Sequence, residues 1–145
     1  MVNGTTVVYK ILKPNAKIPQ RSTEGSAYYD IYTNETYQIG IGEIHLYGTG
    51  LAMYTNDGYF IDIRPRSGLS LKGIFVVNSP GTVDSDYRDE LKIILMNNSS
   101  EPYLIKEGDR IAQMSVMPVE VIRFVETRVG KMNKNVHEGW GSTGR

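Results

Sequence analysis

Apolar and polar residues alternate over short distances along the chain, and Gly, Pro, Asn and Asp separate the short apolar runs. Such runs are typical of strands, and Tyr, Val and Ile fit the half-buried face of a sheet. The pattern therefore predicts an all-β fold, either a sandwich, a barrel or a jelly roll. The expected strands are Thr6–Leu12, Tyr28–Thr33, Glu43–Tyr47, Leu51–Tyr54, Tyr59–Arg64, Ile74–Val77, Leu91–Met96, Tyr103–Lys106, Ile111–Val116 and Glu120–Phe124.

One short helix is expected to interrupt the strands, over Ser67–Leu71 and directly after Pro65. No long stretch has helical periodicity. From Gly130 the sequence GKMNKNVHEGWGSTGR is polar, rich in Gly and Asn, and poor in strand formers. We therefore expect a β domain over residues 1–129 and a flexible arm over residues 130–145. Trp140, the only tryptophan, either docks from this arm or is a stray aromatic in a disordered end.

The composition restricts the possible functions of the chain more than it restricts the possible folds. The 145-residue chain has a formal net charge of zero, so we expect neither nucleic acid nor a membrane as a partner. It has no cysteine, which excludes disulfides, zinc–thiolate sites and thiol catalysis. The N-terminus lacks the apolar core of a signal peptide, so a cytoplasmic location is expected, in a host cell if the source is viral. His45 and His137 are far apart, which argues against a histidine metal site or a Ser–His triad.

The segment NSPGTVDSDYRDE, residues 78–90, lies between two apolar runs and predicts the turn of a hairpin. In the simplest interpretation its Gly and Asp residues are solvated turn residues. In the alternative, a loop held open by two strands presents backbone groups and the Asn78 amide to a planar base. Tyr87 would then pack on a sugar, and Asp84 would act as a general base toward water. The segment alone leaves both interpretations open.

The segment PRSGLSLKG, residues 65–73, also has two interpretations. It is either a proline-led turn into one helical turn or a cradle for an anion. In the second case the N–H groups of Ser67 and Gly68 lie at a helix N-terminus, where phosphate is favoured. Arg66 would add a planar, charged donor.

Two further segments place polar residues within strand patterns. In GDRIAQM, residues 108–114, Arg110 most simply forms a structural ion pair, and Gln113 could donate to a phosphate oxygen. In SAYYDIYTN, residues 26–34, Asp30 is flanked by aromatic residues. A carboxylate there is either paired with Arg or near a hydrated Mg²⁺.

Taken in order, A-x-Y-D, PRSGL, NSPGTVDSDYR, GDRIAQM and GWGSTG resemble the five motifs of the homotrimeric dUTP pyrophosphatase (dUTPase) family. The resemblance covers residues 27–144, and PRSGLSLKGI and NSPGTVDSDYR are long and specific. It implies a distorted β jelly roll and a homotrimer whose active sites combine motifs from more than one subunit. It also implies Mg²⁺-assisted hydrolysis of dUTP to dUMP and pyrophosphate, which keeps uracil out of DNA and supplies dUMP.

The resemblance further implies a role for each motif residue. Asp84 would orient and deprotonate the water that attacks the α-phosphorus. Asp30 would lie near the water shell of Mg²⁺, and Trp140 would stack over the base when the arm closes. The other implied substrate-binding residues are Asn78, Thr82, Val83 and Lys92 for uracil, Gly81 in the same hairpin, Tyr87 for deoxyribose, Arg66, Ser67, Gly68 and Gln113 for the phosphates, and Gly141 and Ser142 in the arm.

Three positions depart from the family pattern. Tyr28 stands where the first motif usually has Gly, and Asp89 stands where the third motif usually has Gly. In the last motif, Asn135 replaces an Arg that would clamp the γ-phosphate. Lys131, Lys134 or the terminal Arg145 could supply the charge, but Lys lacks the bidentate fork of Arg.

We therefore expect arm closure to be weaker in this chain and its KM for dUTP to be raised. Asn135→Arg should lower this KM, because it restores a planar guanidinium to the last motif. Steady-state kinetics of the variant would check the expectation. An unchanged or higher KM would contradict it.

Rival functions fit the same fold. The resemblance extends to dCTP deaminase, but in that family a catalytic Glu lies on the strand after the hairpin. This chain has Ile94 there, which cannot do acid–base chemistry. A non-catalytic dUTP-binding regulatory trimer fits the altered last motif, although a pure binder has no need of a positioned base such as Asp84. An all-β structural protein leaves the ordered motifs unexplained.

Overall fold

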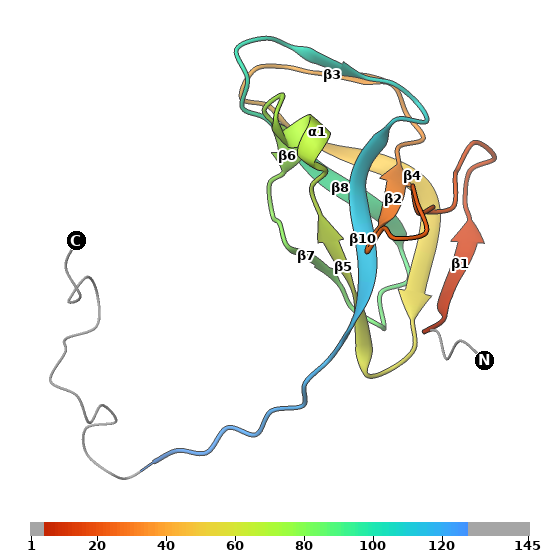
Figure 1. Ribbon diagram of the computed structural model, residues 1–145, viewed down its shortest axis with the longest axis vertical. Coiled ribbons are helices and arrows are strands. Elements are labelled where there is room, and N and C mark those ends of the chain that lie inside the picture. The colour runs from red at the N-terminus through yellow and green to blue at the C-terminus, as the bar shows by residue number, and fades with distance from the viewer. Residues whose placement is uncertain (1–4, 128–145) are drawn as a thin grey trace, which may run out of the picture.

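The computed structural model of the protein, described here over residues 5–127, is built from antiparallel strands with one short helix (Figure 1). One four-stranded sheet has the order β1-β4-β8-β6, a second has the order β2-β10-β5-β7, and β3 pairs with β9. The expected all-β fold with one helix is thus confirmed. The elements are β1 (Val7–Ile11), β2 (Tyr29–Tyr32), β3 (Tyr37–Ile39), β4 (Ile44–Thr55), β5 (Tyr59–Arg64), α1 (Ser67–Ser70), β6 (Ile74–Val76), β7 (Gly81–Val83), β8 (Glu90–Asn97), β9 (Tyr103–Ile105) and β10 (Arg110–Pro118).

The core forms because inward-facing residues alternate along the strands. On β8, Leu91, Ile93 and Leu95 are buried, while the residues between them are more exposed. This period of two is expected when one face of a strand packs against a core. Both large sheets contribute to the same apolar cluster, which includes Ile31, Tyr47, Met53, Ile61, Ile63, Ile111 and Met114. The two sheets are therefore held face to face by one hydrophobic core.

The two strands expected at Glu43–Tyr47 and Leu51–Tyr54 are one long strand, β4, so the predicted break is wrong. The sequence Gly-Thr-Gly causes a shift in register between Gly48 and Ala52, and Gly50 has a positive φ of 71°. The strand continues through this irregularity because Thr49 Oγ1 donates to the Leu91 carbonyl at 2.7 Å. Pairing with β8 therefore preserves a strand that its glycines would otherwise end.

The expected strand at Glu120–Phe124 is also wrong for the single chain. These residues follow Pro118 and leave β10 as an extended segment that runs away from the sheets (Figure 1). Val121 is 94% exposed and Phe124 is 88% exposed. Their β-forming composition remains, but no neighbouring strand of the described chain pairs with them.

Two short strands were not expected. β3 lies outside the expected strands, and β7 lies within the segment that the sequence predicts as a turn. β7 forms because Gly81, Thr82 and Val83 pair with Ile63, Asp62 and Ile61 of β5. Such three-residue strands carry little periodicity of their own, so their pairing partners create them. The other expected strands are confirmed to within two residues at each end.

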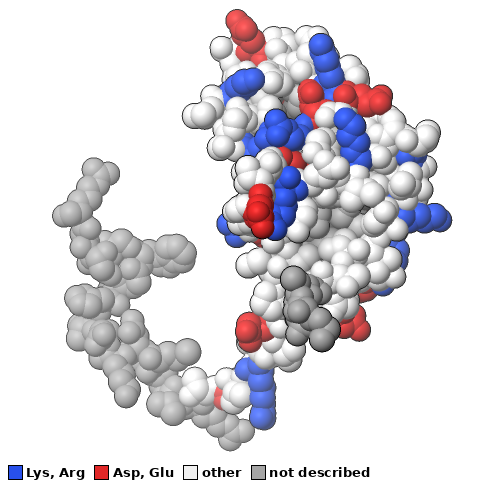
Figure 2. Space-filling model, turned by 45° about the vertical axis from the view of Figure 1, so that its right-hand side comes forward, with Lys and Arg blue, Asp and Glu red and all other residues white. Residues whose placement is uncertain are grey.

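Charged residues of both signs are intermixed on the face that Figure 2 shows, as the zero net charge suggests. Within residues 5–127, the protein has no helix that is long and apolar enough to span a bilayer.

The fully buried Asn97 offers a test of the fold that is independent of function. Its Nδ2 donates to the carbonyls of Ile39 (3.1 Å) and Glu101 (2.8 Å), and its Oδ1 accepts from the Ser99 N–H (2.9 Å). We expect Asn97→Ala to lower the free energy of unfolding by roughly 2–4 kcal/mol, because buried backbone groups lose their partners. Urea denaturation at fixed protein concentration would measure it. Asn98→Ala, at an exposed neighbour, is the matched control, and equal effects of the two variants would contradict the expectation.

Candidate active site

The segment between β6 and β8 is more than a turn, because it contains a strand that pairs with the other sheet. β6 and β8 belong to one sheet, but β7 between them pairs with β5 of the other sheet. The chain therefore crosses from one sheet to the other and returns. This crossing opens a narrow pocket of ≈ 60 Å³, here called the hairpin pocket. Among its lining residues are Asn78, Gly81, Thr82, Val83, Lys92 and Ile94.

The four residues that the resemblance assigns to uracil, together with Gly81, thus line one pocket. Gly81 keeps it open, because a Cβ at this position would lie 3.3 Å from the Ile63 Cβ and 3.5 Å from the Asn78 Nδ2. The 3.3 Å approach to Ile63 is tighter than an ordinary Cβ contact, so a side chain here would press against β5. Glycine suits this close approach of the strands.

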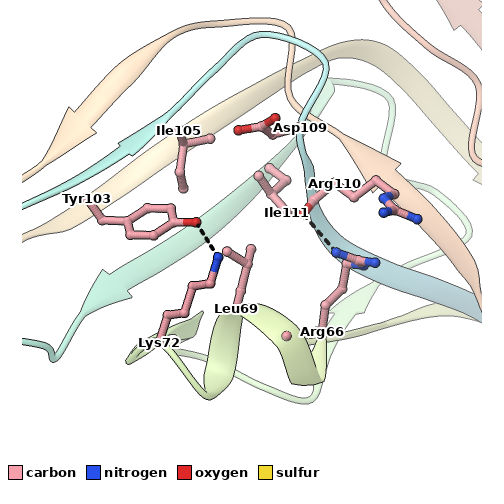
Figure 3. Close-up of a pocket in the computed structure, with 9 residues that line it drawn as sticks. Arg66, Leu69, Lys72, Tyr103, Ile105, Asp109, Arg110 and Ile111 are labelled. Atoms are coloured by element: carbon pink, nitrogen blue, oxygen red, sulfur yellow. Dashed lines mark hydrogen bonds between the residues drawn. The ribbon is translucent and has the colours of Figure 1, made fainter.

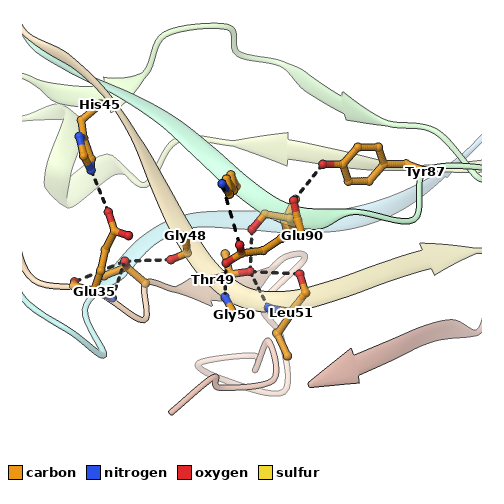
Figure 4. Close-up of polar contacts among 11 residues, drawn as sticks. Glu35, His45, Gly48, Thr49, Gly50, Leu51, Tyr87 and Glu90 are labelled. Atoms are coloured by element: carbon orange, nitrogen blue, oxygen red, sulfur yellow. Dashed lines mark hydrogen bonds and ion pairs between the residues drawn. The ribbon is translucent and has the colours of Figure 1, made fainter. Parts of the chain in front are cut away.

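Asp84 and Tyr87 follow β7 directly and lie next to the residues that line the hairpin pocket, although neither lines it. The Tyr87 N–H donates to the Asp84 carbonyl at 3.2 Å, and the Tyr87 hydroxyl donates to the Glu90 carbonyl at 2.9 Å (Figure 4). The Asp84 side chain is exposed, and Tyr87 is 38% exposed. The ring is therefore fixed at both ends and still presents a face to solvent.

Burial raises the pKa of the Tyr87 phenol, and the negative charges of Asp89 and Glu90 raise it further. The hydroxyl therefore stays protonated at neutral pH and remains a donor to the Glu90 carbonyl. Asp89, one of the departures from the family pattern, thus acts on Tyr87 electrostatically.

Glu90 supports this region and was not singled out from the sequence. Its Oε1 accepts from the Gly50 N–H at 2.9 Å, and its Oε2 lies 4.0 Å from the Lys92 Nζ (Figure 4). The Glu90 carboxylate thus links the start of β8 to the irregular part of β4 at Gly50. A carboxylate that opens an apolar strand was the only sequence signal for this role.

A second pocket, of ≈ 290 Å³, lies around Arg66 and is here called the Arg66 pocket. It brings together Asp30, Arg66, Ser67 and Gln113, which come from β2, from the start of α1 and from β10. Tyr28 lines the same pocket. The sequence assigned three of these residues to phosphate binding and Asp30 to the neighbourhood of a metal.

Asp30 is buried and paired with arginine, which confirms the first of the two alternatives for this residue. Arg66 Nε donates to its Oδ1 at 2.8 Å, and Arg110 Nη1 lies 3.5 Å from its Oδ2. Ser22 Oγ donates to Oδ2 at 2.7 Å. Arg110 is thus an ion-pair former, as expected. Gln113 Nε2 donates to the Pro65 carbonyl at 2.9 Å, which fixes its amide beside α1.

Gly68 lines a neighbouring pocket of ≈ 310 Å³ between α1 and β9, rather than the Arg66 pocket (Figure 3). Arg66 lines both, and its Nη1 donates to the Arg110 carbonyl at 3.4 Å. Lys72 Nζ donates to the Tyr103 hydroxyl at 3.3 Å on the far side. Arg66 therefore separates the two pockets and lies within reach of both.

Tyr28, Asp62 and Arg64 form a cluster beside the Arg66 pocket that the sequence analysis missed. The Tyr28 hydroxyl and the Arg64 Nε each donate to Asp62 Oδ2 at 2.8 Å. Burial raises the pKa of the Tyr28 phenol, and its hydrogen bond to Asp62 adds to this effect. The available signal was Asp62 itself, because a carboxylate inside the apolar run Phe-Ile-Asp-Ile needs a partner.

The hairpin pocket and the Arg66 pocket have no lining residue in common. One chain therefore carries a pocket suited to a base and a separate pocket suited to an anion. Residues 5–127 contain no group of three or more His, Asp or Glu side chains arranged to hold a metal. Asn135, Trp140, Gly141 and Ser142, and with them the expected arm, lie outside the described residues.

An all-β fold with a narrow hairpin pocket and a separate arginine-lined pocket places this chain in a class of jelly-roll proteins that act on nucleotides. The dUTPase family model matches residues 14–144, and the chain belongs to the dUTPase family. It is 44% identical to the deoxyuridine 5'-triphosphate nucleotidohydrolase of Nautilia profundicola, over 94% of this chain and 96% of that protein. The corresponding protein of Ehrlichia canis is 42% identical over 99% of both chains.

Solved structures agree on the fold. The dUTPase of Staphylococcus bacteriophage 80alpha, solved with dUPNHPP, superposes with a TM-score of 0.83 at 24% identity, over 97% of this chain and 99% of that one. A mutant dUTPase from phage phi11 of S. aureus, described with a structural Mg(II) ion, gives 0.78 at 24% identity, over 87% and 99%. The expected family and jelly-roll fold are thereby confirmed.

Proposed function

We propose that the protein hydrolyses dUTP to dUMP and pyrophosphate, with Asp84 as the general base. The observation that carries the proposal is the hairpin pocket, where Asn78, Gly81 and Lys92 come together directly beside Asp84. Membership of the dUTPase family supports it. Such a reaction would act on the nucleotide pool, which fits a cytoplasmic location.

Uracil would be read by polar groups in a space that excludes other bases. The amide of Asn78 offers both a donor and an acceptor, and the backbone of β7 offers more. The methyl group of thymine would not fit in so narrow a pocket, and the amino group of cytosine would place a donor against a donor. Discrimination by unpaired polar groups is stronger than discrimination by fit alone.

The sugar would pack on Tyr87, whose backbone N–H donates to the Asp84 carbonyl and whose hydroxyl donates to the Glu90 carbonyl. A fixed ring leaves no room for a 2′-hydroxyl, so ribonucleotides are disfavoured. Asp84, exposed beside it, is free to orient a water molecule and take its proton.

The triphosphate would lie in the Arg66 pocket. Arg66 supplies charge, Ser67 supplies a backbone donor at the start of α1, and the Gln113 amide is fixed beside them. Gly68 would donate from the neighbouring pocket, which Arg66 also lines. Preorganised donors of this kind stabilise charge that develops on the α-phosphate.

The residues of this site fit a Mg²⁺ ion that binds mainly through substrate phosphates rather than through protein ligands alone. Such ions keep several waters and bind through substrate phosphates with one or two carboxylates. Asp30 is the carboxylate at hand, and because Arg66 and Arg110 already hold it, its contact would run through water. When bound, the metal would offset phosphate charge and help to align the reacting oxygens.

A homotrimer with shared active sites would bring the two pockets together. The base pocket and the anion pocket are separate in one chain, so a complete site needs the hairpin of one subunit and the Arg66 pocket of another. The exposed apolar segment after β10 gives the chain a surface for such contacts. Trp140, Gly141 and Ser142 of the arm would close over the base.

The dCTP deaminase alternative is disfavoured by Ile94. This half-buried residue lines the hairpin pocket, and none of the described residues that line it is a carboxylate. Deamination needs an acid–base group at the base, and the described part of the pocket offers none.

The test is pyrophosphate release by the purified protein with Mg²⁺, across dUTP, dTTP, dCTP and UTP. The proposal predicts release from dUTP alone and no ammonia from dCTP. Binding of dUTP without any release would instead indicate a non-catalytic, regulatory trimer. Equal release from dUTP and UTP would contradict the role of Tyr87.

A further inference from the structure

Asp30, Gln113 and Arg64 form one row across three strands. Gln113 on β10 is the register partner of Asp30 on β2 and of Arg64 on β5. Direct cross-strand partners project their side chains from the same face of a sheet. Because Asp30 and Gln113 line the Arg66 pocket, Arg64 projects from the face on which this pocket lies.

The guanidinium of Arg64 is held in place from two sides. Its Nε donates to the buried Asp62, which also accepts the Tyr28 hydroxyl at the same oxygen. Its Cζ lies 5.3 Å from the centroid of the Tyr28 ring, and Tyr28 itself lines the Arg66 pocket. The hydrogen bond to Asp62 raises the pKa of Arg64, so the group stays charged.

Most of this guanidinium is nevertheless unused. The Arg64 side chain is 50% exposed, and within residues 5–127 nothing accepts a hydrogen bond from its two Nη groups. Arg66, the only cation among the described residues that line the pocket, is already engaged with Asp30 and with the Arg110 carbonyl. Arg66, Arg110 and Asp30 together carry one net positive charge, which is less than the negative charge of a triphosphate.

We propose that Arg64 is a second phosphate-binding residue, whose Nη groups hold the outer phosphates of the nucleotide. The inference rests on the proposed function, since it requires a triphosphate in the Arg66 pocket. A planar guanidinium suits two phosphate oxygens at once, and one that is already held in place loses less entropy on binding. Tyr28 is then a positioning residue that holds Arg64 in place. This role would explain why Tyr stands where the family usually has Gly.

The test compares a non-hydrolysable dUTP analogue with dUMP, which lacks the outer phosphates, by calorimetry on the full chain. Arg64→Gln should weaken binding of the analogue about 10- to 100-fold, as expected for one charge-assisted contact. Binding of dUMP should stay unchanged. The affinity of Arg64→Lys for the analogue should lie between those of the wild type and Arg64→Gln. Tyr28→Phe should lose part of the same affinity while kcat is kept. Lys10→Gln, which removes a cation from β1 in the other sheet, should change neither affinity.

Unchanged binding of the analogue by Arg64→Gln would overturn the inference. So would a parallel loss of analogue and dUMP binding, because a disturbed Asp62 would then explain both. These outcomes are distinct from failure of the proposed function, in which the wild-type protein itself neither binds nor hydrolyses dUTP.

Discussion

Asp84→Asn should abolish nearly all dUTP hydrolysis while dUTP binding is retained. Asn keeps the size and polarity of the side chain but cannot take a proton from water. We expect kcat to fall about 100- to 10,000-fold, the usual contribution of a positioned general base. Because Asp84 is exposed and its carboxylate has no hydrogen-bond partner among the described residues, the fold should be unaffected. Pyrophosphate release and calorimetry with a non-hydrolysable analogue would measure the two effects separately.

Asp86→Asn is the matched control, because it makes the same change at another exposed position of the same turn. It should leave kcat close to that of the wild type. If both variants lose activity equally, general loss of negative charge near the hairpin explains the result. If Asp84→Asn stays active, another group is the base.

Replacing the apolar residues after β10 should abolish both assembly and activity. Val121 and Phe124 are 94% and 88% exposed, and Ile122 and Val125 beside them are 67% and 72% exposed. An apolar run of this kind, exposed in one chain, indicates a contact with another chain. We expect a Val121→Asp, Phe124→Asp double variant to be monomeric in analytical ultracentrifugation and inactive toward dUTP, because charges cannot be buried there without partners.

Glu120→Gln and Glu126→Gln change polar positions of the same segment and should leave assembly intact. A monomeric but fully active double variant would contradict shared active sites. A double variant that still forms trimers would show that another surface holds them together. Mixed trimers give an independent check, since co-expressed Asp84→Asn and Arg66→Ala chains should regain activity where intact halves of the site meet.

The resemblance to the dUTPase family made much of the candidate site predictable. It grouped Asn78, Gly81, Thr82, Val83 and Lys92 as substrate-binding residues, and they line one pocket. These residues are also close together along the chain, so their proximity in space depends little on distant strands. The Asp62 cluster was missed because Tyr28, which directly precedes β2, is far along the chain from Asp62 and Arg64 of β5, and only the tertiary fold brings these residues together.

Errors in the predicted strands have the same physical origin. β4 was divided at Gly48-Thr49-Gly50, since the support that these residues receive from Leu91 and Glu90 comes from β8. The sequence predicts a turn at β7, because a three-residue strand shows no periodicity of its own and depends on pairing with β5. The segment after Pro118 has strand composition but finds no partner among the described residues.

The sequence by itself therefore determined the all-β class, most strand positions, the family and the residues of the hairpin, since these depend on side-chain chemistry over short distances. Only the tertiary structure decided that Asp30 is neutralised by two arginines, that Arg64 projects from the face of the Arg66 pocket, and that the base pocket and the anion pocket are separate in one chain. These facts depend on which strands lie side by side and in which register. Pairing energies accumulate over the whole sheet and leave no local mark in the sequence.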